Sequence, residues 1–291
     1  MKPAPFAYHR PATAAEAAAL LHELGDDAKV LAGGQSLVPM LSLRLAVFEH
    51  LIDIGGIETL RGIERRDDSL WIGAATTDAA VEASPEVAAS APLVARATPL
   101  IGHFQIRNRG TVGGSIAHAD PAAEYPAVAL ALDARLEVLG PERTRTVEAV
   151  DFFSGYWETD LAADELLTGI SFPVWSGRCG FGIEEVARRH GDFAMAGAAV
   201  ALQVDDDDRV TRCGIGLLGL GPTPVRARLA EAEILGCPAD ELDADELGRL
   251  ALRDVEDVPS DLHGSSEYRR RVGAVMVSRA LDAARAEACS G

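Results

Sequence analysis

Cysteine is scarce in this sequence, and none of the four cysteines belongs to a C-x-x-C pair. Zinc sites and iron–sulfur clusters are ordinarily built from closely spaced cysteines, so the sequence predicts neither, and no other metal site is indicated. We interpret the four as reduced thiols that serve as small apolar side chains, which is usual in the cytoplasm. They are Cys179, Cys213, Cys237 and Cys289.

Basic residues are few beside the acidic ones. The 291 residues include 27 Lys and Arg against 45 Asp and Glu, which gives a formal net charge of −18 at pH 7. A protein that binds nucleic acid normally presents a basic face, so this balance argues against a nucleic-acid partner. The acidity also means that a phosphate-bearing ligand would have to be held by local backbone N–H groups, because the overall charge would repel it.

Long apolar runs are missing as well. Stretches such as "AMAGAAVAL" at 194–202 are too short to span a bilayer, and the opening "MKPAPFAYHR" is too polar for a secretory leader. We therefore expect a cytoplasmic chain without a transmembrane segment. The composition, with 48% hydrophobic and 25% charged residues, is that of a globular protein large enough for two or three packed units.

The residue patterns predict strands and helices that do not alternate strictly, which favours an α+β fold. Strands are expected at 28–32, 51–54 and 70–75, with shorter ones near 135–139, 144–150 and 165–172. Helices are expected after Thr13, over 77–97 and from Pro121. Pro and Gly cluster at 172–182, which predicts a domain boundary; beyond it we expect strands joined by a solvated acidic turn at 205–208, then helices over 225–288.

Two short glycine-containing loops stand out. In "VLAGGQSLVP" (30–39) a strand runs into Gly33 and Gly34, and "TVGGS" (111–115) contains the second pair. A glycine pair indicates either a tight turn with positive φ or the close approach of an anion to backbone N–H groups. Two such loops could converge on one diphosphate, or they could be two unrelated turns; the spacing alone leaves both interpretations open.

A third glycine pattern, "GIGLLG" at 214–219, matches the dinucleotide fingerprint G-x-G-x-x-G. That fingerprint requires a helix to begin inside the glycine turn. Pro222 and Pro224 follow here and oppose a helix, so we predict a strand with small residues that ends in a loop.

The longer segments around these loops resemble a known family. "AGGQSLVPMLSLRL", "IRNRGTVGGSIAHADPAAEYPAVALALDA", "EEVARRHGDFAMAGAAVAL" and "GLGPTPVRA" are similar to the FAD-binding medium subunit of molybdenum hydroxylases, in the carbon monoxide dehydrogenase branch of the xanthine dehydrogenase family. The resemblance implies a two-part FAD-binding domain of the PCMH and vanillyl-alcohol-oxidase type over 1–175, with parts at about 1–56 and 57–175. A smaller α+β C-terminal domain would follow at 176–291.

The resemblance also implies a set of FAD-binding residues. One wall of the pyrophosphate site would be Ala32, Gly33, Gly34, Gln35, Ser36 and Leu37, and the other Thr111, Gly113, Gly114 and Ser115. Further positions near the cofactor would be Ile101, Gly102, His118, Glu124, Leu167 and Phe193. Without the resemblance, Glu124 would be a solvated carboxylate on a helix, whereas Leu167 and Phe193 would be core residues. His118 and Asp120 form no recognised metal-ligand set and are interpreted as loop-shaping polar groups.

One departure from the family concerns the charge near the flavin. Relatives of the xanthine oxidase kind carry a lysine where this sequence has Glu184 and Glu185. A cation there would stabilise anionic reduced flavin, so the substitution is expected to make NAD a poor electron acceptor.

As a function, the resemblance implies an electron-transfer subunit of an oxidoreductase. Electrons from molybdenum would pass through [2Fe–2S] clusters to this FAD and on to an external acceptor. The partners would be a small [2Fe–2S] subunit and a large molybdopterin subunit, in a dimer of heterotrimers. We predict no catalytic side chain in this chain. The alternatives are a stand-alone FAD-dependent oxidoreductase on the same scaffold and a binding protein that has lost FAD.

Overall fold

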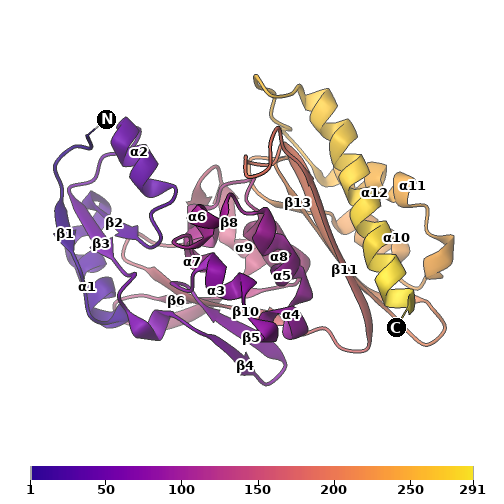
Figure 1. The fold of residues 1–291 in the computed structure, drawn as a ribbon, viewed down its shortest axis with the longest axis horizontal. Coiled ribbons are helices and arrows are strands. Elements are labelled where there is room, and N and C mark those ends of the chain that lie inside the picture. Colours follow the sequence, from indigo (N-terminus) through magenta and orange to yellow (C-terminus); the bar gives the residue numbers. More distant parts are fainter. Residues whose placement is uncertain (1, 291) are drawn as a thin grey trace.

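The computed structural model describes residues 2–290, which form three larger sheets in succession along the chain and one two-stranded sheet (Figure 1). The first sheet lies at the N-terminal end of the molecule, the second occupies the middle, and the third carries the long C-terminal helix (Figure 1). The mixture of helices and strands confirms the predicted α+β class.

The N-terminal sheet is small and parallel. Its strand order is β1-β3-β2, with β1 (Ala7–His9), β3 (His50–Asp53) and β2 (Ala28–Leu31). Helix α1 (Ala14–Leu24) begins at the predicted Thr13 cap, whose side chain accepts a hydrogen bond from Glu16 N at 3.1 Å. Helix α2 (Leu37–Leu43) follows directly after the first glycine loop.

The central sheet is antiparallel, in the order β4-β5-β10-β6-β7. These strands are β4 (Ile63–Arg66), β5 (Ser69–Gly73), β10 (Leu166–Pro173), β6 (Arg135–Leu139) and β7 (Thr144–Glu148), and a separate hairpin joins β8 (Phe153–Gly155) to β9 (Glu158–Thr159). The associated helices are α3 (Asp78–Glu82), α4 (Pro85–Ser90), α5 (Pro92–Ala97), α6 (Phe104–Arg107), α7 (Val112–His118), α8 (Glu124–Ala131) and α9 (Ala149–Phe152).

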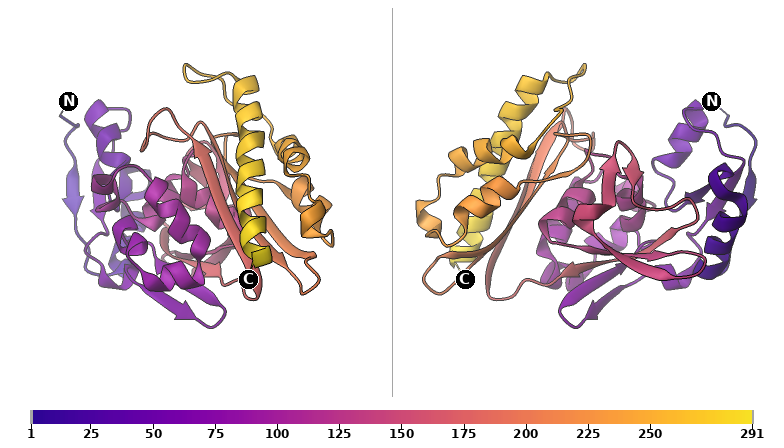
Figure 2. Two further views of the ribbon diagram at one scale, coloured as in Figure 1. Left: turned by 45° about the vertical axis from the view of Figure 1, so that its right-hand side comes forward. Right: turned by 180° about the vertical axis from the view of Figure 1, so that it is seen from behind.

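The third sheet is antiparallel, in the order β11-β12-β13-β14, and lies between α12 and α8 (Figure 2). Its strands are β11 (Arg178–Val186), β12 (Ala196–Val204), β13 (Val210–Leu218) and β14 (Val225–Arg226), followed by α10 (Arg228–Ile234), α11 (Ala244–Ala251) and α12 (Ser266–Ser290). A side chain at Gly214 or Gly216 of β13 would overlap the carbonyl groups of Ala131 or Ala127 on α8. The "GIGLLG" motif is therefore a packing strand, as predicted.

Most predicted elements are present with small changes at their ends. The predicted strands at 28–32, 51–54 and 70–75 correspond to β2, β3 and β5, and the helical region 77–97 is divided into α3, α4 and α5. The helix predicted from Pro121 begins at Glu124 instead, and α7 was not predicted. The acidic turn joins β12 to β13 as expected, with the Asp205 carboxylate accepting hydrogen bonds from Asp207 N and Arg209 N.

Two negative findings hold within residues 2–290. No helix there combines the length and the apolar character needed to cross a membrane. No group of three His, Cys, Asp or Glu side chains there is arranged to hold a metal ion. The four cysteines are all free, including the exposed Cys289.

Candidate functional site

The structure brings the two glycine loops together. Gly33, in the loop between β2 and α2, lies against the backbone of Arg109 and Gly110, which lead into the second loop. Gly114, on α7, faces Thr111 Oγ1 and the side chain of Ala32. The convergence that the sequence left open is therefore present in the fold.

The first loop presents a run of unused backbone donors. Within residues 2–290, no hydrogen bond takes up the N–H groups of residues 33–37. Gly34 adopts φ +73°, and the side-chain amide of Gln35 donates to Gly33 O at 3.1 Å, which holds the turn in shape. Consecutive backbone N–H groups without partners form the kind of concave site that binds an anion.

The second loop differs from this expectation, because its N–H groups are already used. Val112 N donates to Thr76 O at 3.1 Å and Gly113 N to Ala74 O at 3.0 Å. Gly114 N donates to Thr111 Oγ1 at 3.0 Å, so Thr111 is the N-cap of α7. What α7 offers to a ligand is its half-buried face, formed by Gly114, Ser115 and His118.

Two of the four glycines also have a different role from the one inferred from sequence. A side chain at Gly33 would overlap the carbonyl of Arg109, and one at Gly113 would overlap Ala74 on the chain after β5. A side chain at either position is therefore excluded by contacts between backbone segments alone. That these two glycines also admit a phosphate stays a prediction.

Ile101 and Gly102 form a fixed turn beside the second loop. Gly102 adopts φ +52°, and Arg107 Nη1 donates to the carbonyl oxygens of Ile101 at 3.1 Å and Gly102 at 3.2 Å. The Arg107 guanidinium is buried and also pairs with Glu82 at 2.8 Å. Arg107 was not among the predicted residues, because an arginine in "IRNRG" carries no sign of burial.

The two predicted apolar residues lie in opposite environments. Leu167 is 4% exposed and belongs to the core of the central sheet, which matches its alternative interpretation. Phe193 is 65% exposed, in the loop between β11 and β12, so its alternative interpretation as a core residue is wrong. In the same loop His190 packs on His103, with ring centroids 5.7 Å apart.

Of the two residues interpreted as loop-shaping groups, Asp120 forms hydrogen bonds within its loop, whereas His118 is half-buried at the end of α7. Burial lowers the pKa of His118, opposed by the nearby charge of Asp120, so the imidazole is held neutral. Asp120 accepts a hydrogen bond from Ala122 N at 2.9 Å, and the Trp157 ring nitrogen lies 3.5 Å from its other oxygen. Both contacts fix the turn between α7 and α8.

Glu124 is not the solvated carboxylate that its place on a helix indicated. It is 7% exposed at the start of α8, and burial raises its pKa to about 8, with a further increase from the charge of Glu185. Burial likewise raises the pKa of Glu185 to about 7, and its Oε2 is buried without a hydrogen-bond partner. Glu124 on α8 and Glu185 on β11 are thus neighbouring carboxyl groups whose pKa values are both raised. The acidic pair expected near the flavin was Glu184 and Glu185, both of which lie on β11, and its effect on the flavin stays a prediction.

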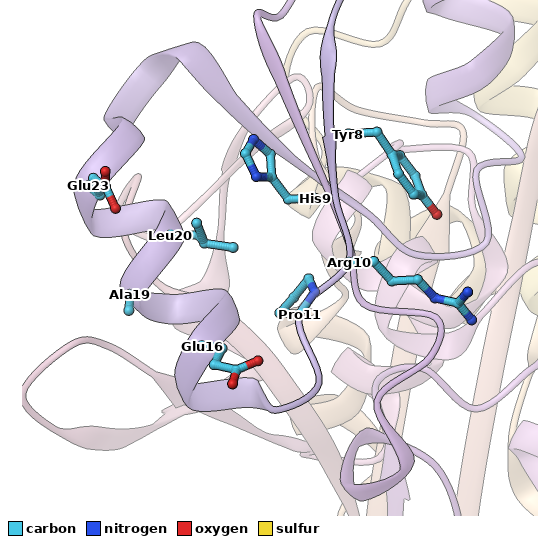
Figure 3. Close-up of a pocket in the computed structure, with 8 residues that line it drawn as sticks. All are labelled: Tyr8, His9, Arg10, Pro11, Glu16, Ala19, Leu20 and Glu23. Atoms are coloured by element: carbon cyan, nitrogen blue, oxygen red, sulfur yellow. The ribbon is translucent and has the colours of Figure 1, made fainter.

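Two surface hollows complete the description. One, of about 420 Å3, lies directly beside Gly102 and is lined by His103, Phe104, Gln105, Arg107 and His190. The other, of about 560 Å3, lies between β1 and α1 and contains none of the predicted residues (Figure 3). There His9, Leu20 and Glu16 lie around the hollow, whereas Tyr8 and Arg10 point away from α1 (Figure 3).

Comparison with known proteins shows the family to which the chain belongs. The family model of the FAD binding domain in molybdopterin dehydrogenase matches residues 4–175, and that of the CO dehydrogenase flavoprotein C-terminal domain matches 182–284. The chain belongs to this flavoprotein family. It is the medium, FAD-carrying chain of an oxidoreductase of the molybdenum hydroxylase type, and its cofactor is FAD.

Individual relatives match over nearly the whole chain. The carbon monoxide dehydrogenase medium chain of Hydrogenophaga pseudoflava is 40% identical, with 98% of each chain covered. The caffeine dehydrogenase subunit beta of Pseudomonas sp. strain CBB1 is 38% identical, with 97% of this chain and 95% of that one covered. The structure of the Cu,Mo-CO dehydrogenase superposes with a TM-score of 0.95 at 39% identity, covering 99% of this chain and 100% of that one.

The residues present fit the FAD of this family. The free N–H groups of residues 33–37 suit a diphosphate, and they compensate locally for the repulsion expected from a net charge of −18. The exposed Phe193 and the hollow beside Gly102 offer surface for a flat aromatic ring system. When bound, FAD supplies the capacity to accept and release electrons singly or in pairs.

Proposed function

We propose that residues 32–37 and the half-buried face of α7, Gly114, Ser115 and His118, hold the diphosphate of FAD. The observation that carries this proposal is the run of unused N–H groups at 33–37, opposite a helix whose own N–H groups are occupied. Thr111 and Gly113 then act indirectly. Thr111 caps α7, and Gly113 allows α7 to pack against Ala74. Leu167 acts as a core residue and is not included.

For the remainder of the cofactor we propose Ile101, Gly102, Glu124 and Phe193. The aromatic side chain of Phe193 is exposed, and His190 in the same loop packs on the ring of His103. The protonated Glu124 carboxyl group can donate a hydrogen bond to a polar edge of the flavin, which an ionised carboxylate cannot do. These groups orient the ring and exclude water from it.

We infer that the chain relays electrons within a larger complex. Electrons would arrive from the [2Fe–2S] clusters of a small subunit and leave through FAD to an external acceptor, while a large molybdopterin subunit oxidises the substrate. We propose a dimer of heterotrimers in the cytoplasm, with 1–175 as the FAD-binding domain, divided at about 56, and 176–291 as the C-terminal domain. The support is that the relatives are named as medium chains or subunits of dehydrogenases.

The substrate is not encoded in this chain. The relatives at 33–40% identity are named for carbon monoxide, caffeine and quinoline, which range from a diatomic gas to nitrogen heterocycles. Such a range of substrates on similar medium chains is expected if the substrate pocket lies in another subunit.

The diphosphate site is tested by a charge placed in the first loop. Ser36→Asp adds a carboxylate beside the phosphates, whereas Ser36→Asn is a neutral control of the same size. We expect FAD to bind the Asp variant roughly 10- to 100-fold more weakly, from a like-charge repulsion at an effective dielectric of about 20, and the Asn variant within about threefold of wild type. Fluorescence quenching of FAD measures both. Equal affinity in the two variants would place the phosphates elsewhere.

A further inference from the structure

Asp78 lies directly beneath the junction of the two glycine loops. It is the first residue of α3, and its side chain is 3% exposed. Its backbone N–H donates to Gly110 O at 2.9 Å, and a side chain at Gly110 would overlap the Asp78 carboxyl oxygen Oδ2. Thr77, the residue before α3, pairs with Thr111 in an isolated antiparallel β-bridge, so the start of α3 lies against the start of the second loop.

The contact continues from Gly110 to the first loop. Gly110 also lies close to Gly33, because a Cβ atom at Gly33 would lie 2.8 Å from Gly110 Cα. The Asp78 carboxyl group therefore contacts Gly110, and Gly110 contacts Gly33. These contacts lead from the interior of the protein to the loop that carries the free N–H groups. Because each contact involves backbone atoms at close range, a displacement at Asp78 is transmitted to Gly33.

Among residues 2–290, no Lys, Arg or His side chain forms an ion pair with Asp78. Its Oδ1 is buried and has no hydrogen-bond partner. Arg107 on α6 attracts it electrostatically but donates its hydrogen bonds to Glu82 and to nearby carbonyl groups. Glu82 on α3 repels it, and from α8 Glu124 and Tyr125 also face its charge. Burial raises the pKa of Asp78 to about 7, so both forms are populated near neutrality.

We propose that Asp78 is a positioning residue for the cofactor, and that the two-loop cradle accepts the diphosphate of FAD only while the Asp78 carboxyl group is neutral. The ionised form would place an unpaired negative charge under a site that must receive two phosphate charges. This inference rests on the proposed diphosphate site.

The test compares Asp78→Asn, which keeps the shape and is always neutral, with Asp151→Asn, an exposed aspartate of α9, as control. FAD binding to the full chain is followed by fluorescence quenching at pH 6.0 and 8.5. If only the neutral form binds, the wild type and the control lose up to about 30-fold in affinity over this range. The Asn variant should lose far less, so its affinity relative to wild type rises with pH.

A second measurement separates the possible failures. Without FAD, the midpoint of urea unfolding for Asp78→Asn should rise relative to wild type between pH 6.0 and 8.5, because the wild type must ionise a buried carboxyl group. If this shift occurs but the ratio of FAD affinities is independent of pH, the positioning role is refuted, whereas the diphosphate site stands. If neither changes with pH, Asp78 is not neutral and the inference fails. If the wild type quenches no FAD at either pH, the diphosphate site fails and the inference fails with it.

Discussion

Replacing Gly33 by alanine distinguishes two reasons for a glycine at the first loop. The structure gives no room for a Cβ atom: besides overlapping Arg109 O, it would lie 2.7 Å from the Arg109 carbonyl carbon and 2.8 Å from Gly110 Cα. Ordinary Cβ contacts are 3.4–4 Å, so one loop must retreat by about 1 Å. Backbone atoms cannot rotate out of the way as a flexible side chain can, so overpacking of this kind costs about 1 to 3 kcal/mol.

We therefore expect Gly33→Ala to lower the free energy of unfolding by that amount even when no FAD is present. Gly140→Ala is the matched control, because its added Cβ meets neighbours only at 3.5 Å and its φ is not positive. The control should stay within about 0.5 kcal/mol of wild type. Urea unfolding of the three proteins without FAD is the assay. If Gly33→Ala unfolds like the control and only FAD affinity falls, the loop-contact explanation is refuted and phosphate approach alone explains the glycine.

Two further predictions concern the acidic group in the site and the proposed complex. Folding raises the pKa of Glu124 from 4.5 to about 8, so its contribution to stability is complete below pH 4.5 and is lost as the pH rises through 8. Glu124→Gln, which cannot ionise, should gain stability relative to wild type between pH 5 and 9, by roughly 3 to 5 kcal/mol, and a constant difference in urea unfolding would contradict this. A tagged chain expressed with its neighbouring genes should copurify with two polypeptides, one showing [2Fe–2S] absorbance and one containing molybdenum. Isolation of a lone flavoprotein that oxidises a substrate would contradict the relay.

Features that depend on a few neighbouring residues were predictable. The Thr13 cap and the Gly25 end of α1 are set by spacing within one helix, and both are present. The prolines after "GIGLLG" excluded a nucleotide-binding helix, and β13 confirms it. The acidic hairpin was also recognisable, since four consecutive aspartates can only be solvated at a turn.

Features that depend on distant packing were not predictable. Helix α7 contains two adjacent glycines, and glycine disfavours a helix. The helix is stabilised by its packing against Ala74, a contact that only a glycine at position 113 allows. Glu124 is buried because β12 and β13 of the third sheet, more than seventy residues later in the chain, cover α8. Asp78 and Arg107 are charged residues in short polar helices, and their burial follows only from the assembled fold. The local sequence around a charged residue does not predict whether that residue is buried, because contacts between distant segments determine its burial.

Glycine pairs are a weak guide to ligands in this protein, because so many glycines serve backbone contacts. Gly180 and Gly182 admit α12, Gly214 and Gly216 admit α8, and Gly33 admits the segment before α7. A sequence motif does not distinguish these glycines from glycines that bind a ligand. What separates the first loop from the others is the state of its N–H groups: those at the start of α7 are paired inside the protein, whereas those of residues 33–37 are not. A buried or half-buried donor is seldom left without a partner, so the unpaired run supports our proposal that an acceptor from outside the chain binds there. The proposed site therefore rests on the state of these hydrogen-bond donors, and the glycines explain how the two loops come close together.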